Sequence, residues 1–163
     1  MNTCSIKPLC VSILTAALAL SLGSARALAA EEEHAHPDKG PHKGALIELG
    51  EEEYHAEILH DDKMHTVTIY VLDAHAEKSV LIDSKEILLN LRNGRKATQF
   101  KLAAAPLKGE RTGLASRFVL KSEALCKLLD DHDTDARLSL KIKGKSYIGK
   151  IPHDHDHDHD HKK

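Results

Sequence analysis

The sequence contains no tryptophan and few other aromatic residues (three tyrosines and two phenylalanines), and it has only three cysteines. Two of these, Cys4 and Cys10, lie near the N-terminus, so Cys126 is the one thiol in the rest of the chain. Because a single thiol cannot form an internal disulfide, the protein must fold on its apolar core. A chain that is poor in aromatics and slightly negative also lacks the basic surface typical of nucleic-acid-binding proteins. We expect no nucleic-acid partner.

Common catalytic motifs are also missing. The chain has no Gly-rich phosphate loop, no Gly-x-Ser-x-Gly and no His-Glu-x-x-His. A metal-dependent hydrolase would need a pocket with at least three converging ligands. A structured segment of roughly 108 residues with so few aromatics leaves little room for such a cavity. We expect that the protein is not an enzyme.

The first 29 residues contain neither an acidic residue nor a histidine. Lys7 makes the start weakly basic, residues 11–22 form an apolar run, and the small residues of "ARALAA" follow. This pattern predicts a secretory signal peptide over residues 1–29, because the apolar run is too short to span a bilayer stably. Cleavage after Ala27 or Ala30 and an uncleaved anchor helix are the alternatives. We expect a periplasmic or secreted protein whose mature chain has no membrane span.

The predicted mature chain has 134 residues, which fit one domain, and keeps all 13 histidines. Loss of the signal leaves 21 basic and 25 acidic residues. Residues 30–43 are polar and contain two prolines, which predicts a flexible arm. Residues 152–163 are of low complexity, and we expect them to be disordered without a ligand. Residues 44–151 would form the folded domain.

Alternation of period two dominates residues 44–151 and predicts strands. In the first hairpin, placing His60 opposite His65 sets Ile58 against Val67 and gives the ribbon one apolar side. The other side, which carries His55 and Glu57, would be polar.

Two further hairpins and one helix follow. Asn93-Gly94 is a strong two-residue turn signal, which pairs Ile87 with Phe100. A turn centred on Gly144-Lys145 would pair Ile142 with Tyr147. "GALIEL" and "SRFVLK" are typical of strands, and "SEALCKLLDDH" is typical of a short helix with Ser122 as N-cap, leucines toward the core and a buried, inert Cys126. The fold class is all-β with one short helix, a small antiparallel β-sandwich or barrel, and the pattern does not choose between the two.

The C-terminal "HDHDHDHDHKK" carries five histidines at alternate positions. Neutral imidazole binds Zn²⁺, Cu²⁺ and Ni²⁺ well, and the interleaved aspartates can bind the ion or accept an imidazole N–H. Ordering such a segment costs about 1–2 kcal/mol per fixed residue, so we expect exchangeable sites and no tightly bound cofactor. The alternative is a solvated end with no metal role. The candidate ligands here are His153, His155, His157, His159 and His161.

Other candidate ligands lie in the arm and in the first hairpin. The arm carries His34, His36 and His42 behind three glutamates. On the predicted hairpin, His60 and His65 would face each other with Cβ atoms about 4.5–5.5 Å apart. That spacing suits two imidazoles on one ion, with Asp61 or Asp62 as a possible third ligand. The alternative is that these are polar surface residues of a half-exposed sheet.

The block "GPHKGALIELGEEEYHAEILHDDKMHTVTIYVLD", residues 40–73, resembles small exported histidine-rich bacterial proteins. It is also similar to the N-terminal segment of some periplasmic adaptor subunits of RND-type heavy-metal efflux systems. The resemblance implies metal handling in the cell envelope, near efflux machinery. The chain lacks the long coiled-coil hairpin and the lipoyl-like segment of the adaptors, so it would be a free-standing module.

Together these features predict an exported protein that binds Zn, Cu or Ni through its terminal histidine clusters. It would buffer the ion or pass it to an efflux component of the envelope. Since neutral imidazole is the ligand, affinity should fall as the pH drops through about 6.5. The alternative is an interaction module, in which a charged edge such as "LKIKGK" augments a partner's sheet and the histidines serve only solubility.

Overall fold

The computed structural model describes residues 39–152 of the chain. The predicted signal peptide, most of the predicted arm and the histidine-aspartate segment lie outside the described residues. Within them, eight strands form one sheet with a single short helix. The elements are β1 (Ala45–Leu49), β2 (Tyr54–Asp61), β3 (Thr66–Leu72), β4 (Glu86–Asn93), β5 (Lys96–Ala104), β6 (Arg117–Lys121), α1 (Glu123–Leu129), β7 (Thr134–Ile142) and β8 (Lys145–Lys150).

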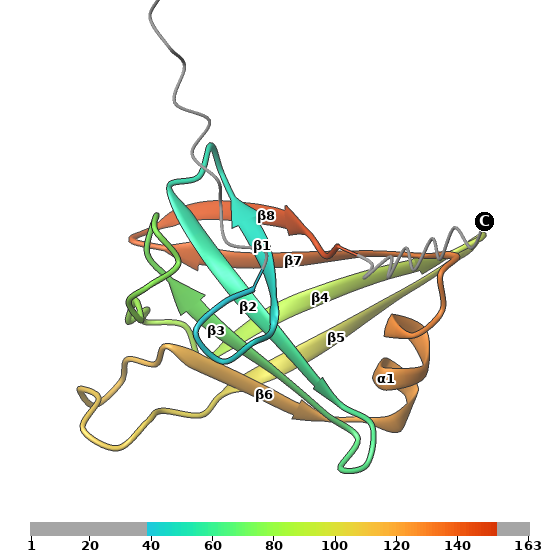
Figure 1. Cartoon of the computed structure of the whole chain (residues 1–163), viewed down its shortest axis with the longest axis horizontal. Coiled ribbons are helices and arrows are strands. Elements are labelled where there is room, and N and C mark those ends of the chain that lie inside the picture. The colour runs from blue at the N-terminus through green and yellow to red at the C-terminus, as the bar shows by residue number, and fades with distance from the viewer. Residues whose placement is uncertain (1–38, 153–163) are drawn as a thin grey trace, which may run out of the picture. The chain divides into compact units, whose positions relative to one another are not determined.

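All neighbouring strands are antiparallel, in the order β1-β2-β3-β6-β5-β4-β7-β8. The sheet curls until its two end strands, β1 and β8, lie side by side, which gives a nearly closed barrel (Figure 1). The predicted all-β class with one helix is therefore confirmed, and of the two architectures the chain adopts the barrel-like one.

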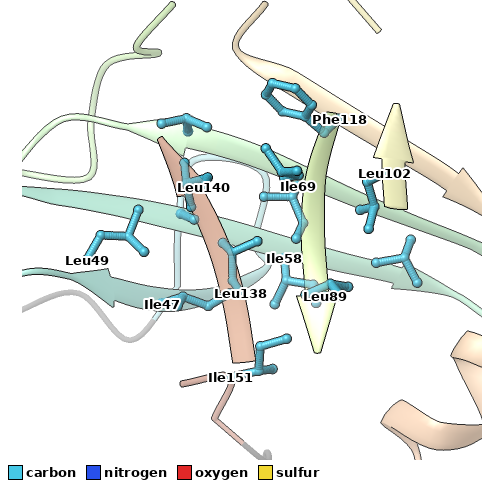
Figure 2. Close-up of a cluster of buried hydrophobic side chains, with 14 of the residues drawn as sticks. Ile47, Leu49, Ile58, Ile69, Leu89, Leu102, Phe118, Leu138, Leu140 and Ile151 are labelled. Atoms are coloured by element: carbon cyan, nitrogen blue, oxygen red, sulfur yellow. The ribbon is translucent and has the colours of Figure 1, made fainter. Parts of the chain in front are cut away.

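The core lies inside this curled sheet. Leucine, isoleucine and valine side chains from opposite parts of the sheet converge there, and Phe118 is the largest side chain that is fully buried (Figure 2). The alternation of buried and exposed residues along β7 shows the pattern that the sequence predicted. Few aromatics are needed because the barrel interior is filled by branched aliphatic side chains.

The predicted registers of the three hairpins are wrong, and each is displaced by two residues. His60 pairs with Val67, Leu89 with Phe100, and Leu140 with Tyr147. Because the displacement is an even number, the apolar side chains keep the predicted face of each ribbon. The pattern of alternation therefore determined which side is buried, and the turns determined the pairing.

The turn conformations explain the displacement. The β7–β8 turn uses Lys143 and Gly144, both with positive φ (50° and 81°), as a type I′ turn requires. In the β4–β5 turn Gly94 (φ 57°) is the first central residue, and Asn93 remains in the strand. The β2–β3 connection takes four residues, Asp62 to His65.

The helix agrees with its prediction. Ser122 is the N-cap, and its side-chain oxygen accepts a hydrogen bond from the N–H of Leu125 at 3.2 Å. Leu125 is fully buried, and Leu128 and Leu129 pack against the core. This helix has seven residues, and the part of the chain described by the structure has no helix long and apolar enough to cross a membrane.

Gly149 makes the close approach of β8 to β1 possible. A Cβ atom at this position would collide with the Ile47 side chain and lie 2.5 Å from the carbonyl oxygen of Glu48. The backbone oxygen cannot move without displacing β1. The close contact between β1 and β8 therefore depends on the absence of a side chain at Gly149.

We predict that Gly149→Ala lowers the free energy of unfolding by about 1–3 kcal/mol, the usual cost of overpacking a filled site. Urea denaturation followed by circular dichroism measures the change. Ser146→Ala, on the exposed side of the same strand, is the control and should stay within about 0.5 kcal/mol of the parent protein. Equal stability of both variants would contradict a tight seam between β1 and β8.

Candidate functional site

His60 lies near the end of β2, on the same side of the strand as the core residue Ile58. Its cross-strand partner Val67 is fully buried, but the His60 side chain keeps 22% of its surface exposed because the barrel ends here. The imidazole is therefore held by the sheet at the mouth of the barrel.

Two carboxylates approach this imidazole from different elements. Asp62 Oδ1, from the β2–β3 turn, lies 2.9 Å from Nε2, and Asp130 Oδ1, at the end of α1, lies 3.4 Å from Nδ1. Ligating atoms of His60, Asp62 and Asp130 all lie within 4.8 Å of one another. Nε2 is buried and has no partner with hydrogen-bond geometry, so the short distance to Asp62 is not a hydrogen bond.

The electrostatic surroundings of this group favour a cation. Asp130 is the C-cap of α1, where the helix macrodipole is negative and an acidic side chain is unfavourable by itself. The pKa of the nearby Cys126 thiol is raised, first by burial and then by the negative charges of Asp62 and Asp130. A proton on His60 or a bound metal ion would offset this negative potential.

His60 and Asp130 line a cleft of about 470 Å³ at the same end of the barrel. Its walls come from the start of β1, the end of β2, the end of α1 and the residues after β8. Asp130 and His132 line one side, Lys43 lies in the segment before β1, and Pro152 is the last described residue. The cleft is where the two ends of the folded domain meet the candidate ligands.

The predicted pairing of His60 with His65 is wrong. His65 ends the four-residue turn with φ 51°, and its carbonyl accepts a hydrogen bond from the Ser122 N–H at 2.8 Å. The longer turn removes His65 from the position opposite His60. Of the two suggested third ligands, Asp62 joins the group, while Asp61 accepts a hydrogen bond from the Met64 N–H at 2.9 Å.

Asp130 is the member of this group that the sequence analysis did not identify. It lies 70 positions after His60 and follows the helix in an ordinary "LDD" sequence. Asp130 comes close to His60 because α1 packs beside the end of the β2–β3 hairpin. No local sequence pattern predicts this packing. The only local signal is an acidic residue at a helix C-terminus, where a basic one is favoured.

His42 has a different environment, on the outer face of the barrel. Its Nδ1 lies 2.7 Å from Glu57 Oε2, and its ring stacks on Tyr70 with centroids 3.8 Å apart. Glu57 is fully buried, although it lies on the side of the hairpin that was predicted to be polar. It is buried because residues 40–44 cover the strand there. His55 on the same face is likewise buried.

The "GPHKG" sequence forms the turn that covers Glu57. The backbone N–H groups of His42 and Gly44 both donate to Glu57 Oε1 at 2.8 Å. A Cβ atom on Gly40 or Gly44 would meet the Glu57 side chain, so glycine is needed at both positions. Residues 39–43, predicted as part of the arm, therefore belong to the folded domain.

The carboxylate of Glu57 also orients His42. A carboxylate on one ring nitrogen is the usual arrangement behind a histidine that binds metal through the other nitrogen. His34, His36 and the five histidines from His153 to His161 lie outside the described residues. The structure therefore places three of the ten predicted ligands, His42, His60 and His65, and does not bring them together on one ion.

We predict that Glu57→Ala lowers the free energy of unfolding by roughly 2–5 kcal/mol, because it leaves buried N–H groups without an acceptor. Glu57→Gln should cost clearly less, since its amide oxygen can still accept from both N–H groups. The exposed Glu48 on β1 provides the control variant Glu48→Gln, which should change little. If all three variants unfold at the same urea concentration, the buried carboxylate does not hold the turn.

Comparison of this chain with protein-family models, with curated proteins and with solved structures found no match. The resemblance of residues 40–73 to exported histidine-rich proteins therefore stays a prediction.

Proposed function

We propose that the protein binds divalent transition metal ions, Zn²⁺, Cu²⁺ or Ni²⁺, and that His60, Asp62 and Asp130 form the binding site of its folded domain. The observation that carries the proposal is the convergence of these three side chains, from a strand, a turn and a helix end, within 4.8 Å. The predicted terminal clusters would collect ions, and the folded site would hold one of them.

The ligand types favour transition metals over Ca²⁺ or Mg²⁺. Ca²⁺ takes six to eight oxygens and Mg²⁺ demands octahedral oxygen geometry, whereas Zn²⁺ accepts a mixed set of imidazole and carboxylate ligands. The negative potential around Asp62 and Asp130 adds a general attraction for cations. A nitrogen and two oxygens therefore support moderate, exchangeable binding.

Binding rather than catalysis is the role that the exposure of the ligands supports. Asp62 and Asp130 keep 73% and 56% of their side-chain surface exposed. A catalytic metal site needs fixed ligands in an enclosed cavity that excludes water. Open carboxylates on a turn and a helix end suit an ion that enters and leaves. We infer that the protein is not an enzyme.

The cellular role follows from the sequence features outside the folded domain. The predicted signal peptide and the resemblance to efflux-associated segments support a role in the cell envelope, where the protein would buffer the metal or pass it to an efflux component. The ion is then a cargo rather than a resident cofactor. Weak, exchangeable sites are what transfer to a partner requires.

Isothermal titration of the chain from residue 30 to 163 with Zn²⁺ tests the proposal. We expect that Asp130→Asn, which keeps the shape and removes the charge, weakens the tightest site by at least about tenfold. His75, exposed on a distant loop, supplies the control variant His75→Ala, which should bind like the parent protein. Removal of residues 153–161 should lower the number of ions bound.

The same titration repeated from pH 7.5 to 5.5 reports competition between protons and metal. Affinity should fall as the pH is lowered, because an imidazole binds metal only in its neutral form and protons compete with the ion. Unchanged binding in Asp130→Asn, together with no response to removing residues 153–161, would contradict the proposed function.

A further inference from the structure

The seam between β1 and β8 differs from the other strand contacts of the described sheet. These two end strands pack side by side without the ladder of hydrogen bonds that joins the other neighbours (Figure 1). Every step from β1 to β8 along the sheet is antiparallel, and the number of steps is odd, so β8 runs opposite to β1. The contact of Gly149 with Ile47 and Glu48 fixes their register.

A groove follows the outer side of this seam. Side chains alternate between the core and the surface, so the outward residues are Leu46 and Glu48 on β1 and Ile148 and Lys150 on β8. All four line the groove, which has a volume of about 530 Å³. Ile148 is 65% exposed, the highest value among the large apolar side chains exposed within residues 39–152. An apolar surface edged by charged side chains is typical of an interaction site.

The four side chains are arranged as a rhombus. Gly149 lies against Glu48, so Glu48 has Ile148 on one side and Lys150 on the other across the seam. Leu46 lies beyond Lys150, because the two strands run in opposite directions. Ile148 and Leu46 therefore occupy the two far corners, and Glu48 and Lys150 face each other across the short diagonal.

The two charged corners are open to a partner. Both Glu48 and Lys150 are exposed, and within the described part of the chain neither takes part in an ion pair. A negative and a positive charge thus flank an apolar line that runs from Ile148 to Leu46. A surface with this pattern matches a second surface that presents the same charges in exchanged positions.

We propose that this groove is the interface of a symmetric dimer of the chain. A two-fold axis along the long diagonal of the rhombus places Ile148 and Leu46 each on the same residue of the second copy. The same rotation exchanges the other two corners, so each Glu48 carboxylate meets the Lys150 ammonium group of the other copy. Two ion pairs then flank an apolar centre, as in an interface with a dry core and a charged rim.

Self-complementarity favours a second copy over another partner. A purely acidic or purely basic partner would satisfy one of the two charges and repel the other, whereas a second copy satisfies both. Four side chains cover less than the about 800 Å² per partner of a standard stable complex, so the dimer should be weak and depend on concentration. Pro152 lines both this groove and the cleft of His60 and Asp130, so the interface would lie beside the candidate metal site. The inference does not depend on metal binding.

Sedimentation equilibrium of the chain from residue 30 to 163 tests the dimer, with a chelator present so that metal does not link the copies. We expect the average mass to rise toward that of two chains as the protein concentration increases. Ile148→Asp should raise the dimer dissociation constant at least about tenfold, because it places a charge at the centre of the interface. Leu81→Asp replaces another exposed apolar residue, outside the groove, and is the matched control. Circular dichroism verifies that both variants fold.

A charge exchange tests the symmetry. Glu48→Lys and Lys150→Glu should each weaken the dimer, since each variant places like charges opposite one another at both ion pairs. An equal mixture of these two variants should associate again, because a dimer with one copy of each restores two attractive pairs. Lys96→Glu, on the exposed β4–β5 turn, changes the net charge equally and should neither weaken the dimer nor restore it in a mixture with Glu48→Lys.

Three results would overturn the inference. One is a parent chain that stays monomeric at every concentration, including one that dimerises only after residues 153–163 are removed, since its own end would then cover the groove. Another is a dimer that Ile148→Asp does not weaken, because the copies would then meet through a different surface. The third is a mixture of Glu48→Lys and Lys150→Glu that associates no better than either variant alone, which would exclude the two-fold arrangement.

Discussion

The contact between β1 and β8 is the constraint on which the rest of the structure depends. It forms because Gly149 presents no side chain to Ile47 and the Glu48 carbonyl, so that an eight-stranded sheet can curl until its end strands meet. Curling encloses the aliphatic core, and it also brings the first and last parts of the folded domain to one end of the barrel. The cleft has Lys43 on one wall and Pro152 on another, and it forms because the sheet curls until β1 and β8 are adjacent.

A second constraint is the burial of Glu57. A carboxylate without solvent is tolerated because two backbone N–H groups and the His42 imidazole surround it. The turn from Gly40 to Gly44 is thereby fixed against β2, which sets the position of the chain where it enters β1. The "GPHKG" sequence therefore has a structural role in this chain. Its two glycines let the backbone approach the Glu57 side chain closely, and the His42 ring lies within hydrogen-bond distance of the Glu57 carboxylate.

Parts of the candidate site could be predicted and parts could not, for separate physical reasons. His60 and Asp62 could be named from sequence because they lie two residues apart at a strand end and its turn. The partner of His60 was predicted wrongly because a four-residue turn places His65 away from it. The length of a turn depends on local conformational energies, and the alternation of apolar and polar residues carries no information about these energies. The three hairpins share this outcome: the inward face was right, and the pairing was displaced by two residues.

The sequence by itself determined the all-β class, the one helix with its Ser122 cap, the buried face of each hairpin and the density of histidines at both ends. These properties are local, since they follow from side-chain periodicity, capping and composition. Only the tertiary structure decided that the strands close into a barrel, that Glu57 is buried, and that Asp130 meets His60. These depend on contacts between segments far apart in the chain, whose energies come from packing and desolvation across the sheet rather than from any short run of residues.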